Sequence, residues 1–263
     1  MDQHDAVAQW LAYLQQRNRS AETLRTYRST MDGYLPDPIA ATREDVEEWW
    51  GTLQHLAVPT RARILSCVRS FYRWAARFDL RADDPTRRLD PPRQGRRIPR
   101  PIGRADLQRI LSHADPDVRR AVCLGAYAGL RVSEAASLDW RDVDIESRRV
   151  FIRGKGDNDR PIGLSPILLD ELLPNTGGNV VRAGGDPYSA DALQRRCNRA
   201  MRAAGVDGTF HKLRSRFATV TLAATGNLLA VSRALGHAST TTTAIYAATS
   251  DSDLDLIADA ATR

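Results

Sequence analysis

Six residues from position 131 onward are candidates for chemistry, because their side chains carry positive charge, titrate near neutral pH or offer a phenol: Arg131, Lys155, His211, Arg214, His237 and Tyr246. The two arginines stand in the segments Gly-Leu-Arg-Val-Ser-Glu and His-Lys-Leu-Arg, and Tyr246 follows His237 by nine positions. Groups of these types can hold an anionic substrate and move protons beside it. We therefore consider them together as one candidate site.

Arg131 and Arg214 suit a phosphodiester substrate. A phosphodiester under attack develops charge on its nonbridging oxygens, and a guanidinium group is always charged and can bind two of them at once. His237 would donate a further hydrogen bond to the same phosphate. The sequence contains no HExxH segment, no CxxC pair and no acidic triad with the spacing of a hydrolase, so we expect neither a metal nor another cofactor.

Each of these residues also has a purely structural interpretation. Arg131 and Glu134 fit an ion pair between positions i and i+3, the second cluster fits a helix face, and His237 fits a helix C-cap. Tyr246 is one of seven tyrosines and fits a core position. Taken singly, the structural interpretations are favoured; the joint occurrence in this order favours a functional site.

The clusters, with Lys155 between the first and the second, resemble the tyrosine recombinase (phage integrase) family over about residues 105 to 249. The family's Arg, Lys, His-x-x-Arg, His and Tyr positions all have a match. The flanking residues also fit, since Phe-Ala-Thr at 217–219 follows the second arginine and Thr-Thr at 241–242 leads to Tyr246. The first ninety residues resemble the family's core-binding domain more loosely.

The resemblance implies that Tyr246 attacks DNA and forms a 3′-phosphotyrosyl bond. Tyrosine has a pKa near 10, so about one phenol in a thousand is ionised at neutral pH and a base is needed. His211 is the candidate base, because imidazole titrates near the working pH. Lys155 is the candidate acid for the leaving 5′ oxygen, since arginine does not readily give up a proton. Glu134, one helical turn after Arg131, would orient an arginine of the site.

Apolar periodicity predicts a mainly α fold with a small antiparallel β-sheet: a helical N-terminal core-binding domain and a mixed α/β catalytic domain. In the first domain, four helices are expected, with Ser20 as an N-cap, Thr42 and Asp45 as a capping box, and Pro59 at the start of the fourth helix. That helix carries an apolar stripe from Ile64 to Phe78.

In the catalytic domain, helices are expected at residues 105–113, 117–127, 166–173, 190–204, 211–224 and 228–235. Short strands are expected at 143–145, 149–153 and 160–164, and the last two flank a glycine-rich hairpin loop that holds Lys155. Residues 175–186 are expected to form a loop. Cys67, Cys123 and Cys197 are dispersed and odd in number, so we expect core residues rather than disulfides.

We expect the domains to span 1–89 and 105–250, joined by a linker at 90–104, with a tail at 251–263. Four prolines between residues 90 and 104 deny the linker a regular helix. An apolar stripe of Leu254, Ile257 and Ala258 in the tail resembles the segment with which such proteins dock onto a neighbouring subunit. A frayed chain end is the alternative.

The net charge of +6 and the isoelectric point near 9.6 favour a polyanionic partner. Two groups of arginines are candidates for phosphate contacts, one with a spacing of four on the fourth helix and one in the linker: Arg69, Arg73 and Arg77, then Arg93, Arg96, Arg97 and Arg100. Because like charges four apart destabilise an isolated helix, the first group is better explained by phosphates than by water. A solvated helix face and a plain basic hinge are the alternatives.

The resemblance implies a site-specific DNA recombinase or integrase that acts on double-stranded DNA attachment or crossover sites as a homotetramer, through a Holliday junction. A Xer-like resolvase, a type IB topoisomerase and a catalytically silent DNA-binding protein are the alternatives. An accessory or directionality protein is a further partner that the resemblance allows. Because the sequence has neither an apolar membrane span nor a signal peptide, we expect no membrane partner and a cytoplasmic, chromosome-associated protein in a bacterial host.

Overall fold

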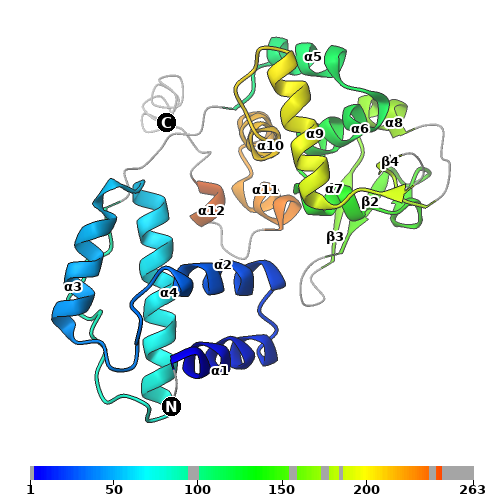
Figure 1. Ribbon diagram of the computed structural model, residues 1–263. Coiled ribbons are helices and arrows are strands. Elements are labelled where there is room, and N and C mark those ends of the chain that lie inside the picture. Colours follow the sequence, from blue (N-terminus) through cyan, green and yellow to red (C-terminus); the bar gives the residue numbers. More distant parts are fainter. Residues whose placement is uncertain are drawn as a thin grey trace, which may run out of the picture. The chain divides into compact units, whose positions relative to one another are not determined.

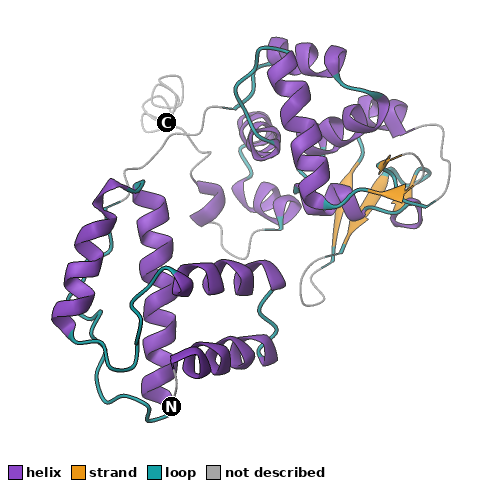
Figure 2. Ribbon diagram, viewed as in Figure 1, coloured by secondary structure: helices purple, strands orange, loops and turns teal. Residues whose placement is uncertain are grey.

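The computed structural model describes residues 3–93, 101–153, 159–172, 178–183, 186–236 and 241–244. The chain divides into two compact units, residues 1–96 and residues 97–263. Helices make up most of both, and the described strands lie in the second unit (Figure 2). The predicted fold class is confirmed. Within the described ranges, no helix combines the length and apolar character needed to cross a membrane.

The first unit is helical throughout. Its elements are α1 (Gln3–Gln16), α2 (Ala21–Asp32), α3 (Arg43–Thr52), the 3₁₀ turn η1 (Leu53–His55) and α4 (Val58–Arg77) (Figure 1). The predicted helix starts are confirmed: the Ser20 side chain accepts from the Thr23 amide, and Thr42 and Asp45 cap each other reciprocally. Pro59 lies in the first turn of α4, where its missing N–H costs no hydrogen bond.

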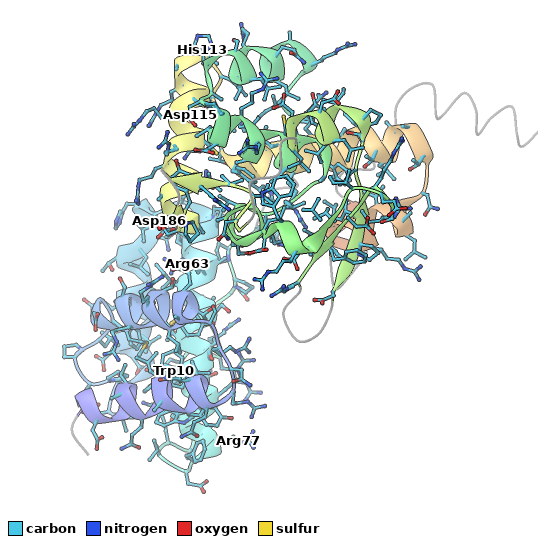
Figure 3. The ribbon with its side chains drawn as sticks, turned by 90° about the vertical axis from the view of Figure 1, so that its right-hand side faces the viewer. Trp10, Arg63, Arg77, His113, Asp115 and Asp186 are labelled. Atoms are coloured by element: carbon cyan, nitrogen blue, oxygen red, sulfur yellow. The ribbon has the colours of Figure 1, made fainter. Side chains whose placement is uncertain are left out.

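Aromatic side chains fill the core of the first unit. Trp10 of α1, labelled in Figure 3, stacks on Tyr27 of α2 with ring centroids 5.4 Å apart and meets Phe71 of α4 edge-on. The predicted apolar stripe of α4 is correct up to Ala75, which is buried. Its last member, Phe78, is 49% exposed because it follows the last helical residue and packs edge-on against Tyr13 instead.

The second unit contains the remaining elements: α5 (Arg104–His113), α6 (Pro116–Tyr127), α7 (Val132–Ser137), η2 (Trp140–Asp142), β1 (Val143–Asp144), β2 (Arg149–Ile152), β3 (Arg160–Gly163), α8 (Pro166–Leu172), β4 (Arg182–Ala183), β5 (Asp186–Pro187), α9 (Ala190–Ala203), α10 (Phe210–Thr225), α11 (Leu228–Leu235) and α12 (Thr241–Ala244). Helix α6 is buried over the unbroken run 121–126 and contacts α7, α8, α9 and α10, so it is the central helix of this unit.

Strands β1, β2 and β3 form the predicted antiparallel sheet. In its register Val150 pairs with Ile162, and Ile152 pairs with Arg160. Buried and exposed residues alternate along β2 and β3, and the four residues of these two pairs are the buried ones that face the interior of the unit. Helix α11 packs against β3, so the sheet and the C-terminal helices meet at this strand.

Three features of the second unit were not predicted: the six-residue helix α7, the 3₁₀ turn η2, and the pairing of β4 with β5, most of which lies in the segment that was expected to be a loop. The three cysteines are buried and free, as predicted. His113 and Asp115, labelled in Figure 3, lie where α5 ends and α6 begins, and Asp115 pairs with Arg196 of α9.

Candidate active site

Arg131 and Glu134 meet at the first turn of α7. Arg131 is the N-cap residue, and Glu134 stands at the third helical position. One carboxylate oxygen of Glu134 accepts from the Arg131 guanidinium at 2.8 Å, and the other accepts from the Arg131 backbone amide at 2.8 Å. This arrangement fixes the direction of a guanidinium that stays 43% exposed. The Arg131 guanidinium can therefore still bind a substrate.

Arg214 on α10 reaches the same place from the interior. The residue is 2% exposed, and its guanidinium donates to the backbone carbonyl of Gly129 at 2.7 Å and to that of Leu235. Its Nη1 lies 3.8 Å from the Glu134 carboxylate. The structure thus brings together two arginines that are far apart in the sequence and lets them share one acidic residue.

The C-terminal end of α11 is bound by three arginines. The carbonyls of Ala234, Leu235 and Gly236 accept, in this order, from Arg160, Arg214 and Arg131. The last carbonyls of a helix lack partners within the helix and carry partial negative charge, so cations are favourable there. The arginine cluster and the end of α11 therefore hold each other in place.

Arg160 belongs to this cluster, although the sequence did not single it out. Its guanidinium donates to Glu134 at 2.8 Å and to the Ala234 carbonyl at 2.8 Å. The alternation of β3 was the signal that could have found it, because Arg160 takes the same face as Ile162 and Leu164, where a charge needs a partner.

The charge of Glu134 is stabilised by this surrounding. Burial alone would raise the pKa of Glu134, but the hydrogen bonds from Arg160 and from the Arg131 backbone outweigh it and hold the pKa below its ordinary value of 4.5. Glu134 is therefore an anion throughout the neutral pH range, and it balances part of the positive charge of the arginines.

His211 lies one helical turn before Arg214, in the first turn of α10, and is exposed. Partial desolvation, together with the positive charges of Arg214 and Arg131, lowers its pKa below the ordinary value of 6.5. The N-terminal end of a helix also disfavours a protonated imidazole. At neutral pH the ring is accordingly uncharged and able to accept a proton.

Lys155, His237 and Tyr246 lie outside the described residues, and their predicted roles stay predictions. The described elements end close to them in the sequence: β2 ends three positions before Lys155, α11 and its C-cap Gly236 end directly before His237, and α12 ends two positions before Tyr246. No group of three or more potential metal-ligating His, Cys, Asp or Glu side chains occurs in the parts of the chain that the structure describes.

The arginines predicted to contact DNA differ in their surroundings. The Arg69 guanidinium donates to the backbone carbonyls of Leu89 and Thr86 and so holds the chain after α4. Arg73 and Arg77 are exposed and border a cavity of about 390 Å³, and Arg93 is exposed. The remaining three lie outside the described residues: Arg96, Arg97 and Arg100.

Comparison with known proteins agrees with this geometry. Residues 102–253 match the phage integrase family, and residues 7–78 match the phage integrase N-terminal SAM-like domain. The tyrosine recombinase XerC of Rhodospirillum centenum is 30% identical to this chain. The matched region covers 93% of this chain and 83% of XerC.

Among solved structures, a lambda integrase dimer bound to a COC′ core site superposes with a TM-score of 0.78 at 20% identity and covers 94% of this chain and 95% of that one. A lambda integrase tetramer bound to a Holliday junction superposes with a TM-score of 0.76 at 19% identity and covers 90% of this chain and 78% of that one. At this identity the likeness concerns the fold. The family match spans more than half of the chain, and the chain belongs to the phage integrase family, that is, to the tyrosine-type site-specific DNA recombinases.

Proposed function

We propose that this recombinase cleaves and rejoins duplex DNA through a covalent 3′-phosphotyrosyl intermediate on Tyr246. The observation that carries the proposal is the cluster at the end of α11, where Arg131 and Arg214 share Glu134 next to His211, whose pKa is lowered. A buried and an exposed guanidinium held on one carboxylate supply fixed positive charge where a phosphodiester would develop negative charge.

The chemical step follows from these groups. The Tyr246 oxygen forms a bond to phosphorus, and the bond between phosphorus and the 5′ oxygen breaks. His211 takes the phenol proton, and Lys155 gives a proton to the 5′ oxygen, which leaves as a hydroxyl. His237 donates a hydrogen bond to the phosphate. The 5′ hydroxyl of a partner strand then attacks the phosphotyrosine and releases Tyr246, so bond energy is conserved and no nucleotide cofactor is consumed.

The assembly that we propose is a homotetramer on two DNA duplexes that passes through a Holliday junction. A lambda integrase tetramer has been solved bound to such a junction. Residues 1–89 bind the DNA core, residues 105–250 carry the chemistry, and residues 251–263 dock onto a neighbouring subunit. The arginines of α4 and of the 90–104 linker contact phosphates. Because relatives that match over most of the chain include bacterial XerC proteins, we favour a Xer-like role over phage insertion and place the protein at a bacterial chromosome.

Covalent capture tests the reaction. Nicked duplexes with randomised and genomic-neighbour sequences trap the intermediate, because the short 5′ hydroxyl strand diffuses away after cleavage. DNA that stays on the protein in detergent is then sequenced. We expect an adduct with the wild type and none with Tyr246→Phe, and the recovered sequences identify the target.

A matched control is Tyr188→Phe, since the Tyr188 ring packs against Arg196 of α9, whose acidic partner is Asp115 and not Glu134. This variant should keep the adduct. Binding without any adduct would favour the catalytically silent protein. Adducts without sequence preference, formed by a monomer, would favour the topoisomerase.

A further inference from the structure

Arg160 occupies a position where a β-strand normally carries an apolar residue. It lies on the buried face of β3, opposite Ile152 and two positions before the fully buried Ile162. Its side chain is 10% exposed. Its exposed neighbours on β3, Pro161 and Gly163, take the other face.

The guanidinium of Arg160 connects two elements that β3 alone would not join. Its Nη2 donates to Glu134 of α7, and its Nε donates to the Ala234 carbonyl of α11, both at 2.8 Å. The fit to α11 is close, because a Cβ added to Gly236 would lie 2.8 Å from Nη1 of Arg160. The planar guanidinium, whose three nitrogens carry five N–H donors, thus binds an acceptor on each of two edges.

A buried ion pair is a poor device for stability alone. Desolvation of both charges cancels much of their attraction, and an apolar side chain of similar size often stabilises a core as well or better. Val150 and Ile162 on the same face show that this part of the sheet accepts apolar residues. The arginine therefore points to a role beyond packing.

We propose that Arg160 is a positioning residue of the recombinase, which ties Glu134 to the last turn of α11 and so fixes the directions of Arg131 and Arg214 at the substrate phosphate. The inference rests on the proposed function. Arg160 does not touch the phosphate in this role. It acts through Glu134, which holds Arg131, and through α11, whose Leu235 carbonyl holds Arg214.

The test compares Arg160→Lys with Arg149→Lys in the full-length protein. Lysine keeps the charge but has no planar fork, so it cannot serve both acceptors in the same geometry. Arg149 is the matched control, because it is an exposed arginine of the neighbouring strand β2 and donates to the adjacent Arg148 carbonyl. DNA affinity and the single-turnover rate of adduct formation are measured on a nicked duplex that carries the captured target sequence.

For Arg160→Lys, we expect an unchanged dissociation constant and an adduct rate about 10- to 100-fold lower, the loss found when a supporting partner of a reactive group is removed. Arg149→Lys should match the wild type in both. Equal rates for Arg160→Lys and the wild type would overturn the proposal. A loss of DNA affinity large enough to explain the lower adduct rate would also overturn it, because that outcome indicates a structural role.

A sulfur substitution separates this role from an effect on Lys155, which precedes Arg160 by five positions. When the bridging 5′ oxygen is replaced by sulfur, the leaving group needs no proton, since a thiol has a pKa of roughly 8.5. The substitution should restore cleavage by Lys155→Ala and leave the defect of Arg160→Lys in place. Restoration of Arg160→Lys to the same degree would mean that Arg160 acts on Lys155, against the proposal.

A double-variant cycle with Glu134→Gln gives a second readout. If Arg160 acts through Glu134, the rate of the double variant should be close to that of the slower single variant, because coupled residues are not additive. Multiplication of the two single effects would show that the residues act independently and would contradict the proposed route.

Amide hydrogen exchange tests the contact without reference to catalysis. In Arg160→Lys, peptides from 228–236 should exchange faster than in the wild type, whereas peptides from α9 should not change. Unchanged exchange at α11 would contradict the proposal even if the rate falls. If the wild type forms no adduct at Tyr246, the proposed function fails, and the exchange measurement still decides whether Arg160 holds the end of α11.

Discussion

Glu134 is the residue on which the arginine cluster depends. It is the acidic partner of Arg131 and Arg160, and its side chain is 12% exposed. Removal of one partner of a buried ion pair leaves the other charges uncompensated, so Glu134→Gln should lower the free energy of unfolding by about 3 kcal/mol at pH 7. Urea unfolding measures this loss. Asp106→Asn, which removes an exposed pair with Arg109, should cost about 1 kcal/mol or less.

The free energy of unfolding that Glu134→Gln loses should also depend on pH. Because the pKa of Glu134 is lower in the folded protein than its ordinary 4.5, the unfolded chain binds the proton more readily. The stabilisation is complete above pH 4.5 and is lost as the pH falls through the folded pKa. The difference between wild type and Glu134→Gln should therefore shrink below pH 4.5. A difference that grows on acidification would contradict the surroundings described for this carboxylate.

His211 should set the acidic limb of the cleavage rate. Its lowered pKa means that the imidazole stays neutral at pH 7 and becomes protonated only below pH 6.5, where it can no longer accept the phenol proton. His211→Gln should reduce the adduct rate at pH 7 by about 100-fold and flatten this limb. His113→Gln, at an exposed histidine that contacts the Arg109 carbonyl, should leave both unchanged. A wild-type limb centred above pH 6.5 would exclude His211 as the base.

The sequence could predict part of this site at the residue level. Arg131, Glu134, His211 and Arg214 were found because each stands in a short cluster of chemically useful residues, and the structure brings these clusters together. Arg160 was missed because 36 of the 38 basic residues are arginine, so its type carries no information. Only the register of β3 and the position of α11 show why it is buried.

At the level of elements, most helices were predictable, including the short α8 and α11, whereas α7 and the β4–β5 pair were not. An apolar stripe and a cap define α2 and α9 over three or more turns, whereas α7 offers six residues and no full stripe. The pairing of β4 with β5 involves two residues on each strand, which is too short for an alternation to be seen. These elements exist because of tertiary contacts, which local sequence patterns do not contain.

Gly236 and Gly226 offer a test of how α11 is held. Both end a helix in the left-handed conformation, with φ of +63° and +62°. A Cβ at Gly226 meets nothing within 4 Å, so Gly226→Ala should cost about 1 kcal/mol of backbone strain and keep the adduct rate. A Cβ at Gly236 would press on Arg160, so Gly236→Ala should cost about 2 to 4 kcal/mol and slow adduct formation as well. Urea unfolding and covalent capture measure the two effects.

Equal behaviour of the two glycine variants would mean that the contact between Gly236 and Arg160 does not matter for the reaction. A slow Gly236→Ala with normal stability would instead separate positioning from folding. The comparison is well matched in φ, which is 62° at Gly226 and 63° at Gly236, and both residues are left-handed helix caps; they differ in ψ, which is 0° and 45°, and in their neighbours.

On the scale of the whole molecule, the two units have separate hydrophobic cores. The described core residues of the first unit lie between Ala6 and Leu89, and those of the second lie between Ile102 and Leu235. A substitution that weakens one core should therefore leave the packing of the other unchanged. This separation allows the proposed DNA binding by the first unit to be altered without disturbance of the arginine cluster in the second.

Salt dependence can show which arginines of α4 contact DNA. Affinity for DNA falls as the salt concentration rises, and each neutralised phosphate makes the slope of log affinity against log salt concentration steeper by about 0.9. Arg73 is exposed and borders a cavity with Arg77, which lies at the C-terminal end of α4 in Figure 3. Arg73→Gln should therefore reduce the slope by about 0.9. Fluorescence anisotropy of the full-length protein on labelled duplex, over a series of salt concentrations, measures it.

Arg69 is the internal control for this experiment, because it stands one turn before Arg73 on the same helix and donates to the Leu89 and Thr86 carbonyls. Arg69→Gln should lower the stability of the first unit and leave the slope unchanged. A reduced slope for Arg69→Gln would show that Arg69 contacts a phosphate as well. An unchanged slope for Arg73→Gln would instead favour a solvated helix face, and the phosphate contacts of this unit would have to come from other basic residues.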